Sequence, residues 1–330
     1  MGLAAWPGAL LFQGYGRGAH LRRLDGRTGK TLWSFETGGS TYAVPAIGDL
    51  DGDAAAEILV HAHRYDPSRE VLFCLDPGGK ERWRFEGRPS ADQERNAPAE
   101  LGWVPDFGYH SPILGDFAGS RAPEVLHATR CRTYLLDARG RTIWDVPLVE
   151  GFGVLLEVDA GGKVVPDEHG TGGDKDAWAA GDLDGDGRLD PVLSMGPEVR
   201  VRVDRSSGRK TYERVARGNR VRALDGRTGR ERWRFEGEYP DPAGVDRMLR
   251  PLLVDLDGDR RLDVIVGSTD GHLYGLSGRD GRRSWALPFP DRDPLPLALA
   301  TEEGRLLVLV GTMDAAGTIE LAAVALDPPR

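Results

Sequence analysis

The chain has 330 residues, 40% of them hydrophobic, and a formal net charge of −9. This length and hydrophobic content predict one sizeable globular domain spanning residues 1–330. There is no run of like charge, no basic patch with interleaved aromatic residues and no apolar stretch of membrane-spanning length, which argues against nucleic-acid-binding and membrane-spanning classes.

A tryptophan-bearing segment recurs five times along the chain. The copies begin at Leu24, Leu75, Leu136, Leu224 and Leu276 and end at Trp33, Trp83, Trp144, Trp233 and Trp285. Each contains a glycine-bearing turn, and glycine accepts the positive φ that tight turns require. We therefore expect a hairpin in each copy, with its tryptophan packed structurally between neighbouring blades.

Three acidic nonapeptides, residues 49–57, 182–190 and 255–263, precede apolar strands. Each carries carboxylates at positions 1, 3, 5 and 9 and a glycine at position 4. The twelve acidic residues are Asp49, Asp51, Asp53, Glu57, Asp182, Asp184, Asp186, Asp190, Asp255, Asp257, Asp259 and Asp263. Ca²⁺ takes six to eight such oxygen ligands, so the spacing predicts three calcium sites. The alternative, three metal-free acidic turns, is disfavoured by the identical spacing.

These loops are not EF-hands. An EF-hand needs a bidentate Glu at position 12, where this chain has Val60, Leu193 and Val266. A β-like segment, rather than a helix, follows each loop. A fourth loop, residues 116–124, has the same length but lacks the central carboxylates, and we expect no metal there.

Together the two motifs define units of four short strands: a before the acidic loop, b after it, c before the turn, and d with the tryptophan. Complete units are expected at 45–87, 111–148, 176–237 and 251–287, with incomplete ones at 8–36 (strands b to d) and 297–327 (strands a to c). Four strands per unit predict an all-β fold, a β-propeller. Six blades are expected, with seven as the alternative.

The tryptophan-bearing segments resemble the repeats of quinoprotein-like (PQQ-type) propellers, a group that includes an outer-membrane assembly lipoprotein. The acidic segments resemble the FG-GAP repeats of integrin-α-type calcium-binding propellers. This resemblance implies a scaffold of six to eight blades with calcium in the a–b loops. Quinoprotein enzymes need a larger ring and usually a vicinal cysteine pair, whereas Cys74 and Cys131 are separate, so no PQQ is expected.

The long insertions 88–110, 149–179, 195–219 and 238–250 map to the side opposite the acidic loops, and so do all seven histidines. Variable loops on a rigid scaffold usually carry function. The candidate working residues are Tyr109, His110, Arg130 and His169, although polar residues collect at strand ends of any β protein. His61 and His63 alternate on one strand, which is a weak start for a transition-metal site.

Two functions are compatible with these features. The favoured one is a monomeric, calcium-binding propeller that binds a carbohydrate or a protein through the insertion-bearing face. Millimolar extracellular calcium favours an extracytoplasmic location, although residues 1–7 lack a secretion signal. The alternative is a polysaccharide lyase, with Tyr109 or His110 as base and Arg130, Arg132 or Lys175 neutralising a uronate carboxylate.

Overall fold

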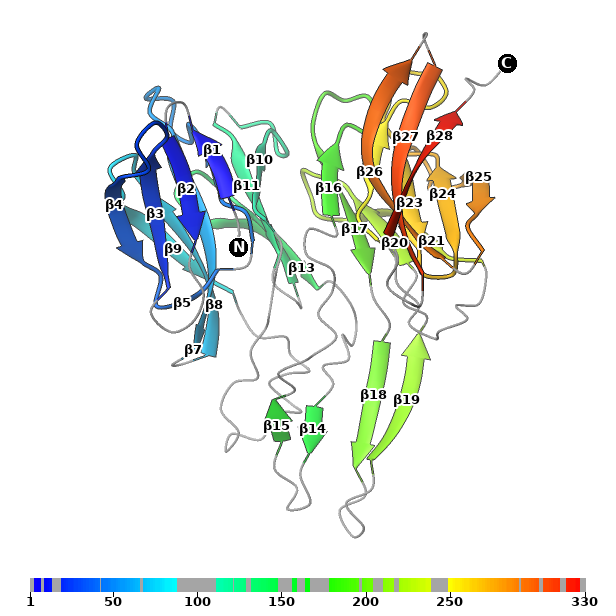
Figure 1. Ribbon diagram of the computed structural model, residues 1–330, viewed down its shortest axis with the longest axis horizontal. Coiled ribbons are helices and arrows are strands. Elements are labelled where there is room, and N and C mark those ends of the chain that lie inside the picture. The colour runs from blue at the N-terminus through cyan, green and yellow to red at the C-terminus, as the bar shows by residue number, and fades with distance from the viewer. Residues whose placement is uncertain are drawn as a thin grey trace. The chain divides into compact units, whose positions relative to one another are not determined.

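The computed structural model describes most of the β structure of the chain (Figure 1). The described residues are 3–6, 9–13, 19–41, 43–65, 68–87, 111–120, 122–128, 132–147, 156–158, 164–166, 178–195, 198–203, 210–216, 220–238, 249–290, 292–302, 305–314 and 319–326. They form strands and turns without a helix, so no helix of membrane-spanning length occurs among them. The chain divides into two compact units, residues 1–176 with 200–213, and residues 177–199 with 214–330.

The first unit contains three large antiparallel sheets. The first sheet is β1 (Leu3–Trp6), β2 (Ala9–Gln13), β3 (His20–Asp25) and β4 (Thr31–Glu36). The second is β5 (Gly39–Ser40), β6 (Ala46–Gly48), β7 (Glu57–Tyr65), β8 (Ser68–Leu75) and β9 (Glu81–Glu86). The third is β10 (Ile113–Gly115), β11 (Glu124–Ala128), β12 (Arg132–Leu136) and β13 (Thr142–Pro147).

The second unit contains three further antiparallel sheets. The first is β16 (Trp178–Gly181), β17 (Asp190–Met195), β20 (Arg220–Leu224) and β21 (Glu231–Glu236). The second is β22 (Leu252–Val254), β23 (Asp263–Ser268), β24 (His272–Leu276) and β25 (Arg283–Pro288). The last has three strands, β26 (Arg292–Glu302), β27 (Arg305–Asp314) and β28 (Ile319–Leu326).

Three features of this strand plan differ from the expected one. The segment expected to supply only strands b to d gains β1, which pairs with β2 from Leu3↔Phe12 to Trp6↔Ala9. Strand a of the second sheet is split into β5 and β6, which both pair with β7. Two insertions contain hairpins of their own, β14 (Leu156–Val158) with β15 (Val164–Pro166), and β18 (Glu198–Val203) with β19 (Lys210–Ala216).

Consecutive sheets within each unit pack face to face. Along β7, Ile58 and Val60 point into the core shared with the first sheet, while Leu59 joins the core shared with the third. In the same way, Val264 and Val266 of β23 face the sheet before them, and Ile265 faces the sheet after. Both faces of these sheets are therefore buried, as the two-residue period of a strand allows.

In three sheets, the tryptophan on strand d donates a hydrogen bond to the next sheet in the chain, a contact that we call a tryptophan latch. The indole N–H of Trp33 donates to the Pro77 carbonyl at 3.0 Å, that of Trp83 to Ala138 at 3.0 Å, and that of Trp233 to Gly278 at 2.6 Å. Each acceptor lies in the turn after strand c of the following sheet. The ring also covers a positive-φ glycine of that turn, Gly79, Gly140 or Gly281 respectively.

These observations confirm the predicted fold class: an all-β chain of four-stranded antiparallel blades with the packing of a β-propeller. The blade count and the single-domain organisation stay predictions.

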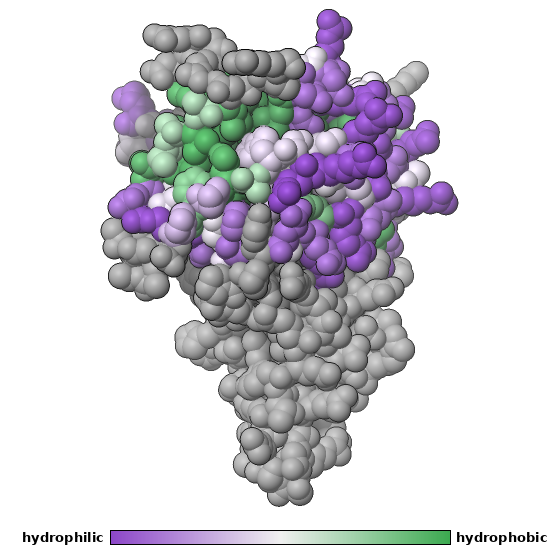
Figure 2. All heavy atoms as spheres, turned by 90° about the vertical axis from the view of Figure 1, so that its right-hand side faces the viewer, coloured by the Kyte–Doolittle hydropathy of each residue, from purple (hydrophilic) through white to green (hydrophobic). Residues whose placement is uncertain are grey.

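The large apolar side chains exposed in the second unit all belong to the last, three-stranded sheet among the described residues: Leu297, Leu299, Leu309, Ile319 and Leu321. Figure 2 shows hydrophobic residues gathered in one area of the face it presents, beside hydrophilic ones.

Candidate metal centres

The three acidic loops each bring the carboxylates of positions 1, 3 and 5 together. In each loop one carboxylate oxygen per residue lies within 4.8 Å of the others. The groups are Asp49, Asp51 and Asp53, then Asp182, Asp184 and Asp186, then Asp255, Asp257 and Asp259. Each group combines half-buried and exposed side chains, so the converging oxygens remain open to solvent.

Backbone hydrogen bonds to the first carboxylate shape each loop. In the second loop, Asp182 Oδ1 accepts from Gly185 N at 2.6 Å and Oδ2 accepts from Gly187 N at 2.9 Å. The loops at Asp49 and Asp255 repeat both bonds. The glycine at position 4 has a φ between 81° and 82° in all three loops, as its place in the motif predicts.

Position 6 also has positive φ, which the motif does not indicate because the residue there varies. It is Gly187 in the second loop but Ala54, with φ 66°, and Arg260, with φ 70°, in the other two. A residue with a Cβ pays about 1–2 kcal/mol in this conformation. The first and third loops therefore carry backbone strain that the second avoids.

We expect Ala54→Gly to raise the free energy of unfolding of the metal-free protein by about 1 kcal/mol, because glycine relieves this strain. Urea denaturation in the presence of chelator measures the effect. The neighbouring change Ala55→Gly is the control: its φ is not positive, so the change should cost about 0.5–1 kcal/mol. Equal effects of the two substitutions would contradict the assignment of strain to position 6.

The structure does not gather the carboxylates at position 9 with the other three. Glu57 Oε2 accepts from Leu50 N at 2.8 Å. Asp263 accepts from Leu256 N and from Gly278 N, both at 2.9 Å, and so ties the acidic loop to the c–d turn of its own sheet. Both side chains are buried. Their roles in the described geometry are therefore to hold the loop in place.

Asp190, at position 9 of the second loop, is held in the same way as Asp263. Its Oδ1 accepts from Gly226 N at 2.9 Å, and a backbone hydrogen bond from Leu183 also stabilises the carboxylate. Burial raises the pKa of this carboxyl to about 6. The positive charge of Arg232, 3.7 Å from Oδ2, offsets part of the cost of burying this carboxylate.

In two of the loops, an arginine from strand d of the same sheet forms ion pairs with the acidic residues. Arg82 of β9 donates to Asp51 Oδ2 at 2.5 Å and also binds Glu57. Arg232 of β21 donates to Asp184 Oδ2 at 2.7 Å and lies 3.7 Å from Asp190 Oδ2. The hydrogen bond from Arg82 lowers the pKa of Asp51. Burial is the largest single influence on the pKa of Asp184 and raises it, but the hydrogen bonds from Arg232 and Asp186 N and the charges of Arg232 and Arg261 together lower the pKa.

The fourth loop satisfies its acidic residues internally. Glu124 is fully buried, and its oxygens accept from the backbone N–H groups of Phe117, Ala118 and Ser120. Asp116 Oδ1 accepts from Gly119 N at 2.8 Å. The loop keeps its shape with only these two carboxylates. That it binds no metal stays a prediction.

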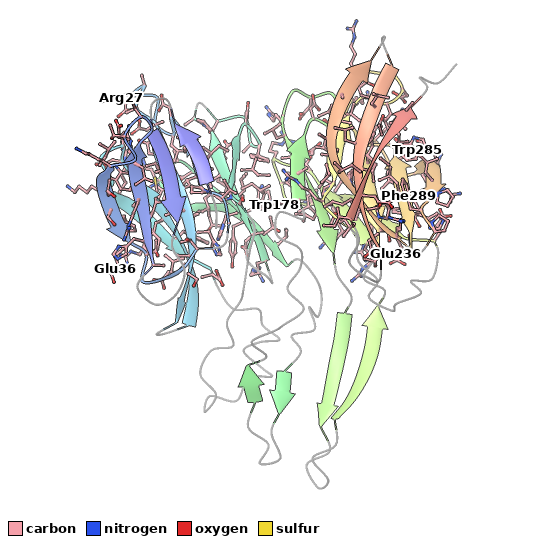
Figure 3. The ribbon with its side chains drawn as sticks, viewed as in Figure 1. Arg27, Glu36, Trp178, Glu236, Trp285 and Phe289 are labelled. Atoms are coloured by element: carbon pink, nitrogen blue, oxygen red, sulfur yellow. The ribbon has the colours of Figure 1, made fainter. Side chains whose placement is uncertain are left out.

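The predicted working residues Tyr109, His110, Arg130 and His169 lie outside the described residues, as does Lys175. Their assignment to a shared site therefore stays a prediction. Two residues close to these positions in sequence, Arg132 and Trp178, are described. Arg132 pairs with Asp145 on the adjacent strand, and Trp178, labelled on β16 in Figure 3, is only 4% exposed. Neither side chain lines an open surface by itself.

Two of the described histidines are buried in the core. His61 and His127 are 1% and 0% exposed, and their ring centroids lie 5.3 Å apart between the second and third sheets. His61 pairs with buried Glu70, and His127 packs on Phe85 and Tyr134. These two histidines are therefore not part of an accessible face. The side chain of His63 lies outside what the structure describes, so a metal site at His61 and His63 stays a prediction. In the second unit, His272 lies 3.3 Å from Asp270.

Cys74 is a buried free thiol, as expected for a small apolar residue. Burial raises its pKa to about 12. It packs with Leu59, Leu72 and Val125 in the core between the second and third sheets. Burial therefore favours the protonated, unreactive form of the thiol.

Comparison with known proteins identifies one family. The family whose model matches is described as "outer membrane protein assembly factor BamB", and it matches residues 68–294. A lupanine 17-hydroxylase [cytochrome c] from Pseudomonas sp. is 48% identical over 52 residues, which is 16% of this chain and 7% of that protein. The chain thus spans a small part of that curated relative.

Solved structures with similar folds have low sequence identity. BamB from Moraxella catarrhalis is 16% identical, with 95% of this chain and 81% of that chain covered and a TM-score of 0.40. Sqt1 from Saccharomyces cerevisiae is 9% identical, with 99% and 75% covered and a TM-score of 0.49. The quinohemoprotein alcohol dehydrogenase ADHIIG from Pseudomonas putida is 13% identical, with 94% and 61% covered and a TM-score of 0.44.

Proposed function

Since the chain belongs to the outer membrane protein assembly factor BamB family, we propose that it is a protein-binding β-propeller module that works outside the cytoplasm and is stabilised by calcium. The family assignment rests on the match over residues 68–294. This range includes two of the acidic loops and the carbonyl acceptors of all three tryptophan latches described. The protein-binding role and the location are proposed from that family, and the calcium from the acidic loops.

The calcium part of the proposal rests on the chemistry of the donor sets. Three aspartates converge in each of three loops, and hard carboxylate oxygens are the ligands Ca²⁺ prefers. Arg82 and Arg232 already place a cation at two of these sets. The residues therefore fit a cation, with Asp at positions 1, 3 and 5 as ligands and water completing the shell.

Bound Ca²⁺ would supply charge neutralisation in these loops. Three ions would change the formal net charge from −9 to −9 + 6 = −3. The chain's own residues do the remaining work: the position-1 aspartates order the loop backbone, and the position-9 carboxylates anchor each loop to its sheet. The consequence would be a rigid end to each of these three blades.

We expect chelation to lower the melting temperature and added Ca²⁺ to restore it, because a ligand that binds only the folded state stabilises it. At 100 times Kd one site contributes about 2.7 kcal/mol. Differential scanning fluorimetry with metal analysis measures both the shift and the stoichiometry. Asp184→Ala should remove one ion, and Asp116→Ala in the fourth loop is the matched control that should remove none. An unchanged melting curve with no bound metal would reject the calcium proposal.

The protein-binding part can be tested separately from calcium. Tagged protein expressed in its own host should fractionate outside the cytoplasm and crosslink to components that assemble outer-membrane proteins. A glycan array and a uronate-absorbance assay on the same preparation address the other candidates. Binding to glycans alone would replace the protein partner with a carbohydrate, and an unsaturated uronate product would establish a lyase. Cytoplasmic fractionation would overturn the proposed location.

A further inference from the structure

The residue immediately before the repeated tryptophan on strand d is an arginine in two of the three blades that have an acidic loop. It is not an arginine in the two blades with this tryptophan that lack such a loop. In the second sheet it is Arg82, and in the fourth sheet along the chain, which begins with β16, it is Arg232. Both guanidinium groups reach back to the acidic loop of their own sheet, 31 and 48 residues away in sequence. Both bind the aspartate at position 3, with additional contacts to the acidic residue at position 9.

Blades without an acidic loop have an apolar residue at the same place. It is Leu32 in the first sheet and Ile143 in the third, and these side chains are 54% and 43% exposed. The strand thus points this position to solvent and accepts several residue types. The strand itself therefore does not require an arginine at this position. Arg82 and Arg232 are explained instead by the carboxylates that they contact.

The blade with the third acidic loop has no arginine at this position. Its residue before Trp285 is Ser284, which is exposed on β25 (Figure 3 labels Trp285). Among the described residues, no lysine or arginine lies within ion-pair distance of Asp257 at position 3. Arg261 lies 3.9 Å from Asp259, but Arg188 lies at 3.5 Å from the equivalent Asp186 of the second loop. That contact is therefore common to both loops and does not distinguish them.

We propose that Arg82 and Arg232 are built-in counter-cations that weaken calcium binding at their loops and partly replace it, whereas the Asp255–Asp259 loop depends on bound Ca²⁺ and binds it most tightly. This inference rests on the proposed calcium sites. It divides them into one tight site, controlled by Ser284, and two weaker sites. The fourth and fifth sheets, which are neighbours in the second unit, would then respond to calcium at different concentrations.

The physical reason is competition for the same oxygen. A guanidinium bonded to the position-3 carboxylate neutralises part of the charge that attracts Ca²⁺, and the ion must displace it or bind beside it. Repulsion between a single positive charge and a divalent ion a few ångströms away weakens binding about tenfold even in water. In the absence of calcium, the same guanidinium relieves the repulsion among the aspartates.

The experiment measures calcium binding by isothermal titration calorimetry on metal-stripped full-length protein and its variants. Wild type is expected to show one tight site and two sites about tenfold weaker. Arg82→Ser or Arg232→Ser should move one weak site into the tight class, and Ser284→Arg should weaken the tight site about tenfold. Arg84→Ser is the matched control, because Arg84 lies on the same strand as Arg82 but pairs with Glu81. It should change none of the affinities.

A second readout separates altered binding from altered folding. In chelator, Arg82→Ser and Arg232→Ser should melt below wild type and recover with Ca²⁺, whereas Ser284→Arg should melt at or above wild type. Three sites of equal calcium affinity, unchanged by all three substitutions, would overturn this inference while leaving the calcium sites in place. No calcium binding by wild type at millimolar concentration would instead reject the proposed sites themselves.

Discussion

Replacing Trp233 with alanine is expected to lower the free energy of unfolding by about 3–5 kcal/mol, the usual cost of truncating a large buried aromatic residue. The side chain is 6% exposed and packs with Val264, Val266 and Tyr274 of the following sheet. Its indole N–H also donates to the Gly278 carbonyl at 2.6 Å. Truncation therefore opens a cavity between two sheets and leaves a buried carbonyl without its donor.

Denaturant unfolding in saturating calcium measures this loss, and two variants control it. Trp233→Phe keeps most of the packing and loses the hydrogen bond, so about 1–2 kcal/mol is expected. Trp33→Ala should cost less than Trp233→Ala, because Trp33 makes the equivalent bond to Pro77 but is half-buried. A Trp233→Ala protein with wild-type stability and lost partner binding would show that the tryptophan is a ligand contact.

The second large effect is expected at Gly281, where alanine should cost about 2–5 kcal/mol. Gly281 has φ 70°, and a Cβ there would lie 2.5 Å from Cε3 of Trp233. The same ring cannot retreat easily because it is buried between two sheets. Backbone strain and a steric clash with the ring therefore add up at this position.

Gly29 separates these two causes. Its φ of 69° matches that of Gly281, but a Cβ at Gly29 meets nothing within 4 Å. Gly29→Ala should thus show the backbone strain alone, about 1–2 kcal/mol. Urea unfolding of the two variants side by side gives the difference. If both lose the same amount of stability, the ring does not constrain the turn.

The repeat made most of the fold predictable, because two motifs that alternate along the chain mark every complete blade twice. The positive φ at Gly52, Gly185 and Gly258 followed from the motif in the same way. Strand β1 could not be predicted, since Leu3–Trp6 carries neither motif. The hairpin β18/β19 also escaped prediction, because it lies inside an insertion whose sequence does not repeat.

The candidate sites were less predictable, for reasons of side-chain direction. Spacing placed Asp263 among the metal ligands, but spacing does not reveal that its two oxygens accept backbone N–H groups of Leu256 and Gly278. His61 was expected beside a strand end but lies in the middle of β7, and it and His127 are both buried, which their sequence positions do not reveal. Arg82 could have been found from sequence, since an arginine precedes the tryptophan in two of the three blades with acidic loops.

The tryptophan latches also impose an order on the assembly of the chain during its synthesis. Every latch described runs forward: Trp33, Trp83 and Trp233 wait for carbonyls that lie 44, 55 and 45 residues further along. At a translation rate of roughly 5–20 residues per second, each ring is made about 2–11 s before its acceptor. During that interval the newest blade on a ribosome exposes an indole ring and one apolar face, which the next blade covers as it emerges.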